Sequence, residues 1–216
     1  MDEKKIKAEN IEQVAIFGSS HAKPDSELVE QVFEVCKQLA EAGYIVVNGG
    51  GPGVMRAATM GAKSVKGKVI GIVLEADTYM HYEGQVPKNK FDIEIKAKNY
   101  VERTLALMRE GQVYVIFNGA SGTMSEFSMA WGLARMYFGH HKPLILYGNF
   151  WKDIMYALRR HLLLRPEEKK VYKIVNSPEE VLRAIRKFEA EIQAGEHKHL
   201  DTHCEDGVCQ VGDYII

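Results

Sequence analysis

Short apolar runs alternate with longer amphipathic stretches along most of the chain, and this alternation constrains the fold more than any other feature. The apolar runs predict strands at Val14–Gly18, Tyr44–Asn48, Val69–Leu74, Val113–Phe117, Leu144–Tyr147 and, more weakly, Val171–Val175. The amphipathic stretches predict helices at about 26–42, 54–66, 99–110, 124–138 and 151–163, with a last helix after Ser177. Strands that alternate with helices need crossover connections. The sequence therefore predicts an α/β fold, a single Rossmann-like, doubly wound parallel sheet with helices on both faces.

The size and charge of the chain limit its domain organisation and its partners. A length of 216 residues with 46% hydrophobic residues suits one domain, which we place at residues 1–193, followed by a polar tail at residues 194–216 that contains His and Cys. The 28 Lys and Arg residues almost balance the 29 Asp and Glu residues, so no basic excess favours a nucleic-acid partner. No run of about 18 apolar residues suggests a membrane partner, and we expect a cytoplasmic protein.

Two segments fall outside the alternation. The connection Glu75–Lys98 is longer than ordinary loops, and its Tyr79, His81 and Tyr82 favour a lid over a ligand. The tail gathers five residues of metal-ligating type within thirteen positions, which are His197, His199, His203, Cys204 and Cys209. Their spacing matches no four-ligand zinc pattern, so a solvated tail is favoured over a metal site and no metal is predicted.

Three loops of small residues follow three of the predicted strands. They are Gly18-Ser19-Ser20, Gly49-Gly50-Gly51-Pro52-Gly53 and Gly119-Ala120-Ser121-Gly122-Thr123. Ligands of open parallel sheets bind beyond the carboxyl ends of the strands, and small residues leave backbone N–H groups at helix starts accessible to anions. Any one of the loops could be an ordinary turn, but three at one sheet edge indicate a phosphate site. The glycine spacing of the second loop departs from the dinucleotide pattern, so NAD is disfavoured and no cofactor is expected.

Two charged residues near these loops allow a catalytic and a structural interpretation. Glu126 lies three residues after Thr123, which is the spacing of a helix capping box, so it could be a cap or a catalytic carboxylate. Asn99 and Glu102 have the same spacing one helix earlier. Arg103, beside Glu102, could be a solvated helix charge or a ligand contact. Spacing alone leaves both pairs of alternatives open.

The combined pattern resembles the LONELY GUY (LOG) family, once labelled possible lysine decarboxylases. The signature of that family, Pro-Gly-Gly-x-Gly-Thr-x-x-Glu, corresponds to the segment from Asn118 to Glu126, and Arg103 falls at the arginine position of the Arg-Lys pair that precedes it. The loops at Gly18 and Gly49 also match family segments. The resemblance covers roughly residues 11–150. Three departures are Asn118 for proline, Ala120 for glycine and Thr104 for the lysine of the pair.

This resemblance implies a nucleoside 5′-monophosphate phosphoribohydrolase. Such an enzyme hydrolyses the N-glycosidic bond of a ligand such as AMP and releases the free base and ribose 5-phosphate. Cleavage builds positive charge on the sugar, which a fixed carboxylate stabilises, so Glu126 is the catalytic candidate. We expect it to be ionised because it lies in a helix first turn. Arg103 is expected to clamp phosphate or ribose. No group is assigned to protonate the departing base, because His81, on the expected lid, is better explained as an ordinary surface histidine.

A carrier function is the alternative. Molybdenum-cofactor carrier proteins of similar fold hold a phosphorylated ligand without catalysis, and the departures at Thr104 and Asn118 favour this interpretation, whereas Arg103 and Glu126 together favour the enzyme. We also expect a homodimer. The stretch Phe127–Phe138 is apolar around most of its circumference, which is more than one sheet contact can cover, and members of the resembled family are dimers.

Overall fold

The computed structural model describes residues 11–75, 89–136 and 142–193. In these ranges the chain forms one seven-stranded sheet in which every pair of neighbouring strands is parallel. The strands are β1 (Gln13–Phe17), β2 (Ile45–Asn48), β3 (Val69–Leu74), β4 (Ile93–Ala97), β5 (Val113–Ile116), β6 (Leu144–Tyr147) and β7 (Tyr172–Val175), in the spatial order β4-β3-β2-β1-β5-β6-β7. The predicted α/β fold with a doubly wound parallel sheet is confirmed.

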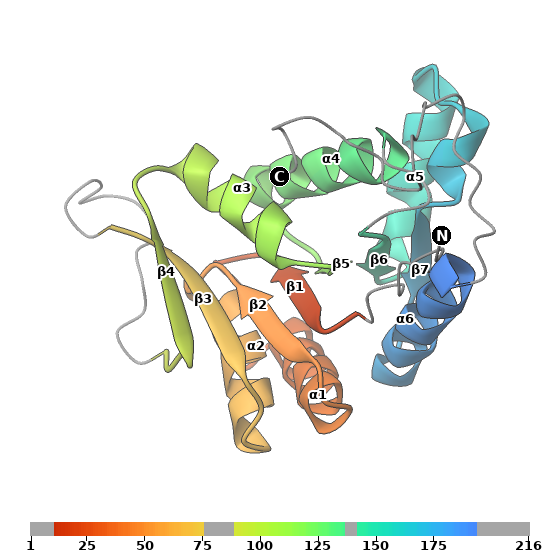
Figure 1. The fold of residues 1–216 in the computed structure, drawn as a ribbon. Coiled ribbons are helices and arrows are strands. Elements are labelled where there is room, and N and C mark those ends of the chain that lie inside the picture. The colour runs from red at the N-terminus through yellow and green to blue at the C-terminus, as the bar shows by residue number, and fades with distance from the viewer. Residues whose placement is uncertain (1–10, 76–88, 137–141, 194–216) are drawn as a thin grey trace, which may run out of the picture.

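Helices cover both faces of the sheet, as Figure 1 shows. They are α1 (Glu27–Glu41), α2 (Val54–Ser64), α3 (Tyr100–Glu110), α4 (Ser121–Met136), α5 (Phe150–His161) and α6 (Pro178–Gln193), with a short 3₁₀ helix at Pro166–Lys169. The helices α1, α2 and α6 share one buried apolar cluster with the sheet, and α3, α4 and α5 share the other. The central strands separate the two clusters, and β5, β6 and all of β1 beyond Gln13 are buried, as expected of a sheet covered on both faces. No helix among the described residues is long and apolar enough to cross a membrane.

One strand was missed by the sequence prediction. Strand β4 lies inside the connection Glu75–Lys98 that we interpreted as a lid, and it pairs with β3 at the edge of the sheet. Its burial explains the error, because only Ala97 is buried and Ile93 is 54% exposed, which leaves little of the apolar pattern of an internal strand. Tyr79, His81 and Tyr82 lie outside the described residues.

The helix starts also separate correct predictions from wrong ones. Asn99 caps α3 by accepting a hydrogen bond from the backbone N–H of Glu102 at 2.9 Å, and Ser177 caps α6, with Pro178 as its first residue. The capping-box interpretation of Thr123 and Glu126, one of the two alternatives that the spacing left open, is wrong. Helix α4 begins earlier, at Ser121, and the N–H of Met124 already bonds to the carbonyl of Ala120 at 3.0 Å. The loop of small residues itself forms the first turn.

The order of the strands determines where a ligand can bind. Strands β2, β3 and β4 follow one another across the sheet on one side of β1, and β5 lies on the other side of β1. The connections after β1 and β5 therefore diverge to opposite faces, and a crevice opens between the carboxyl ends of these two strands. The first and third loops of small residues both reach this crevice.

Candidate functional site

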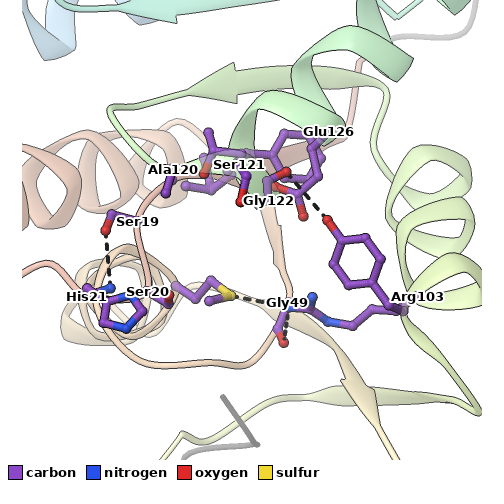
Figure 2. Close-up of a pocket in the computed structure, with 15 residues that line it drawn as sticks. Ser19, Ser20, His21, Gly49, Arg103, Ala120, Ser121, Gly122 and Glu126 are labelled. Carbon is purple, nitrogen blue, oxygen red and sulfur yellow. Dashed lines mark hydrogen bonds between the residues drawn. The ribbon is translucent and has the colours of Figure 1, made fainter. Parts of the chain in front are cut away.

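A cavity of about 330 Å³ lies at this crevice. Figure 2 shows the labelled side chains arranged around one space, with Ser19, Ser20 and His21 on one side and Arg103 on the other. Most of the predicted binding and catalytic residues line it, namely Gly18, Ser19, Ser20, Gly49, Arg103, Ala120, Ser121, Gly122, Thr123 and Glu126. The remaining predicted residues, which are Gly50, Gly51, Gly53 and Gly119, are not among its lining residues.

Ser19 joins the three loops into one rigid unit. Its backbone N–H donates to the carbonyl of Asn118 at 2.9 Å, and its carbonyl accepts from the N–H of Val54, also at 2.9 Å. Its hydroxyl accepts from the N–H of His21 at 3.1 Å. The loop after β1 is therefore bonded to the loop before α4 and to the start of α2, which preorganises the small-residue wall of the cavity.

Two of the glycines outside the cavity explain why this packing needs glycine. Gly53 has a positive φ of 60°, and a Cβ atom there would lie 2.3 Å from the carbonyl oxygen of Ser19. A Cβ atom on Gly119 would lie 2.1 Å from the Thr123 hydroxyl. Both glycines allow two loops to approach each other closely, so they shape the wall of the site from behind.

Arg103 is a buried part of the site, so the interpretation of a solvated helix charge is wrong. Its side chain comes from α3 and the residue is only 8% exposed. The Nε atom donates to the carbonyl of Ile72 at 3.1 Å, and Nη2 donates to the carbonyl of Gly49 at 2.8 Å and contacts the Met55 sulfur at 3.3 Å. No hydrogen bond from Nη1 to another described residue is present. The guanidinium is thus fixed through two of its nitrogens, and the third has no hydrogen bond to a described residue.

Glu126 faces the same cavity and is also only 8% exposed. Within the described part of the chain no group donates a hydrogen bond to its carboxylate, and no ion pair joins it to Arg103. Burial raises its pKa to about 7, and the charge of Arg103 opposes that rise. The expected position of Glu126 in the first turn is wrong, because α4 starts at Ser121 and Glu126 lies in its buried second turn. The helix start therefore does not favour the ionised carboxylate as we expected, and burial favours the protonated form.

Five residues that the sequence analysis did not select as site residues also line the cavity. Ile16 and Phe17 belong to the end of β1, and the others are His21, Met55 and Tyr100. His21 follows the loop after β1, and its Nδ1 lies 3.2 Å from the Ser20 hydroxyl. Tyr100 bridges α3 and α4, with its hydroxyl 2.7 Å from that of Ser125. A sequence signal exists only for His21, which directly extends the Gly-Ser-Ser run.

Two of the three departures from the family signature, Thr104 and Asn118, lie outside the cavity lining. Thr104 is buried, its hydroxyl donates to the carbonyl of Tyr100 at 2.9 Å, and it does not line the cavity. The backbone carbonyl of Asn118 accepts the hydrogen bond from Ser19, so this bond does not depend on the type of side chain at position 118. In the described ranges no group of three or more His, Cys, Asp or Glu residues could hold a metal ion. His81 and the ligand types of the tail, from His197 to Cys209, lie outside those ranges.

Comparison with known proteins agrees with this architecture. The family model described as the SLOG cluster4 family (LDcluster4) matches residues 11–179. An uncharacterized protein of Archaeoglobus fulgidus is 29% identical over 119 residues, which cover 55% of this chain and 72% of that protein.

Solved structures share the fold over most of their length. The molybdenum cofactor binding protein of Rippkaea orientalis superposes with a TM-score of 0.63 at 21% identity and covers 82% of this chain and 97% of its own. The Moco carrier protein of Chlamydomonas reinhardtii gives 0.62 at 19% identity, covering 84% and 99%. The protein TM1055 gives 0.62 at 26% identity, covering 82% and 99%. These comparisons support the broader SLOG relationship and do not single out the LOG family.

Proposed function

This chain belongs to the SLOG cluster4 family, and we propose that it binds a small phosphorylated ligand of mononucleotide size in the cavity between β1 and β5. One observation carries the proposal. Two buried ionisable side chains, Arg103 and Glu126, face the same cavity without forming an ion pair with each other. Buried charges are costly unless they are paired. A ligand that presents an anionic oxygen to Arg103 and a donor group to Glu126 would satisfy both.

The size and lining of the cavity support a ligand of this class. A volume of about 330 Å³ lies at the lower end of the range for small-molecule sites, which suits one nucleotide better than a dinucleotide. The wall at Ala120, Ser121 and Gly122 is the start of α4, where the first backbone N–H groups have no partners within the helix. Phosphate oxygens suit such a wall because the helix dipole adds a partial positive charge there.

Binding without chemistry is the form of the proposal that the similar proteins favour. Two of the similar structures are described as proteins that bind or carry the molybdenum cofactor. Their likeness extends to the fold, and Thr104 lacks the positive charge of the lysine that the LOG signature has at this position. We therefore propose a carrier or sensor of a phosphorylated ligand as the first candidate.

Hydrolysis of a nucleoside 5′-monophosphate is the second candidate, favoured by Glu126. A carboxyl group with a pKa near 7 can exchange a proton at neutral pH, which suits a general acid or base, and its ionised form would stabilise positive charge on a sugar. AMP is the probe because it combines a phosphate with a purine base. Release of free adenine from AMP by the wild type, abolished in Glu126→Gln while AMP binding remains, would identify the enzyme.

Two glycines of α4 provide a matched test of binding. A Cβ atom on Gly122 would meet only the Tyr100 hydroxyl, at 3.7 Å, and one on Gly132 would meet nothing within 4 Å, so both positions have room for a side chain. Gly122 lines the cavity, whereas Gly132 does not. We expect Gly122→Val to block AMP and inorganic phosphate, measured by calorimetry, and Gly132→Val to bind both as the wild type does. Equal affinities in the two variants would contradict the assignment, as would a wild type that binds neither probe.

A further inference from the structure

The residues that lead into β4 return to the sheet beside the second loop of small residues. The side-chain amide of Asn89 donates to the carbonyl of Gly50 at 2.7 Å and to that of Gly51 at 3.2 Å. Two carbonyl acceptors require a donor, so the amide nitrogen and not the oxygen faces the turn. Asn89 does not line the cavity, and among the turn residues only Gly49 does.

Side chains from three different elements hold this turn. Arg103 donates a hydrogen bond to the carbonyl of Gly49 at 2.8 Å, and the Asn89 side chain donates to the carbonyls of the next two residues, Gly50 and Gly51. Asn48, which is fully buried, accepts the N–H of Gly50 at 2.9 Å and donates to Thr59 at 3.0 Å. Gly50 has a positive φ of 73°, so the turn has a conformation that needs such support. All three carbonyls of the turn are directed to donors of the protein.

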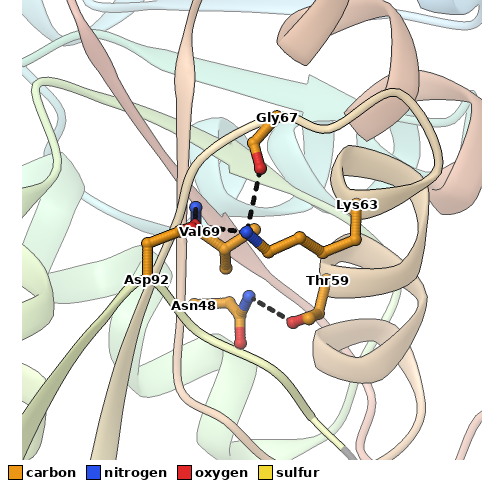
Figure 3. A network of polar contacts seen from close by, with 6 residues as sticks. All are labelled: Asn48, Thr59, Lys63, Gly67, Val69 and Asp92. Carbon is orange, nitrogen blue, oxygen red and sulfur yellow. Dashed lines mark hydrogen bonds and ion pairs between the residues drawn. The ribbon is translucent and has the colours of Figure 1, made fainter.

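The segment that carries Asn89 is itself anchored away from the cavity. Figure 3 shows Asp92 between the Lys63 side chain and the backbone of Val69, whose N–H donates to the carboxylate at 2.7 Å. Lys63 also donates to the carbonyl of Gly67 at 3.0 Å. This anchor joins Asp92 to α2 and β3, and no hydrogen bond or ion pair among the described residues joins Lys63 or Asp92 to the turn. It therefore holds the segment of Asn89 from outside the ligand site.

We propose that Asn89 is a positioning residue for ligand binding, which holds the Gly49–Gly51 turn so that Gly49 and the Arg103 guanidinium keep their places in the cavity wall. This inference rests on the proposed function. Without the amide donor, the carbonyls of Gly50 and Gly51 lose their partner and the turn can rotate. A rotated peptide would direct a carbonyl dipole toward the anionic ligand, and Arg103 would lose the fixed acceptor at Gly49.

The test compares four variants of the full chain by calorimetric titration with AMP. Asn89→Ala removes the donor, Asn89→Asp keeps the shape but places acceptors against two carbonyls, and Asn89→Gln keeps the amide. Lys63→Met removes the anchor contact that does not touch the turn. We expect about tenfold weaker AMP binding in Asn89→Ala, a larger loss in Asn89→Asp, and recovery of at least part of the affinity in Asn89→Gln. Lys63→Met should lower thermal stability while its affinity stays within about twofold of the wild type.

A readout without ligand separates this inference from the proposed function. Hydrogen exchange of the Gly50 amide, which Asn48 protects, should accelerate in Asn89→Ala and Asn89→Asp and stay slow in Lys63→Met. If the wild type binds no AMP yet this pattern appears, the ligand assignment fails and the positioning role stands. The inference is overturned if Asn89→Asp keeps the wild-type AMP affinity and slow exchange, or if Lys63→Met reproduces both effects of Asn89→Ala.

Discussion

Replacing Glu126 by glutamine should make the protein more stable at alkaline pH, although this residue is the best candidate for ligand contact. Glu126 is 8% exposed and its carboxyl group has no hydrogen-bond donor among the described residues, so its charge is poorly solvated. Glutamine has nearly the same shape and carries no charge. Functional residues that are strained or poorly solvated in the free protein commonly cost stability in this way.

The magnitude follows from the change in pKa between the unfolded and folded states. Burial raises the pKa of Glu126 from 4.5 to about 7, so the folded state binds the proton more tightly. The resulting stabilisation is fully present below pH 4.5 and is lost as the pH rises through 7. With about 1.4 kcal/mol per pKa unit, the wild type should lose roughly 2 to 3 kcal/mol from this group between about pH 5 and pH 8, whereas Glu126→Gln should lose none of it.

The assay is urea unfolding of both proteins, without ligand, at pH 5 and pH 8. Other titrating groups contribute equally to both proteins, so the difference between their pH dependences isolates Glu126. Glu30→Gln, at an exposed position of α1, controls for the general effect of this replacement and should follow the wild type. Equal pH dependence in the wild type and Glu126→Gln would refute the argument, because it would mean that the carboxylate is well solvated or paired in the folded protein.

Three further predictions concern glycine positions and the oligomeric state. Gly49→Ala should weaken AMP binding about tenfold or more, because a Cβ atom there would lie 1.7 Å from Nη2 of Arg103 and displace the guanidinium, and calorimetry would measure the loss. Gly53→Ala should lower the free energy of unfolding by about 1 to 3 kcal/mol in a urea titration, because φ is positive and the Ser19 carbonyl lies in the path of the methyl group. We expect a homodimer through the outer face of α4, where Met136 is 54% exposed, and light scattering should show a dimer for the wild type and a shift to monomer for Met136→Glu. A monomeric wild type at micromolar concentration would remove the last prediction.

The sequence by itself determined the layered architecture and the sheet edge at which the candidate site lies. Buried parallel strands need continuous apolar runs, and such runs can be recognised in the local sequence. Strands such as β3 and β6 were therefore located with correct ends. Helix starts with a polar cap, as at Asn99 and Ser177, are local signals as well. The small-residue loops after β1 and β5 could be placed together because topology alone brings the carboxyl ends of these strands side by side.

Only the tertiary structure decided which residues of those loops face the cavity and how they are charged. Strand β4 is an exposed edge strand without the apolar run of an internal strand, and its pairing with β3 places it in the sheet. Gly119 allows the close packing with Thr123 at the start of α4, and the pKa of Glu126 depends on its burial and on the charge of Arg103, which comes from α3. Asn89 contacts a turn 38 residues away. Desolvation and long-range hydrogen bonding depend on distances in space, and such distances exist only after the chain has folded.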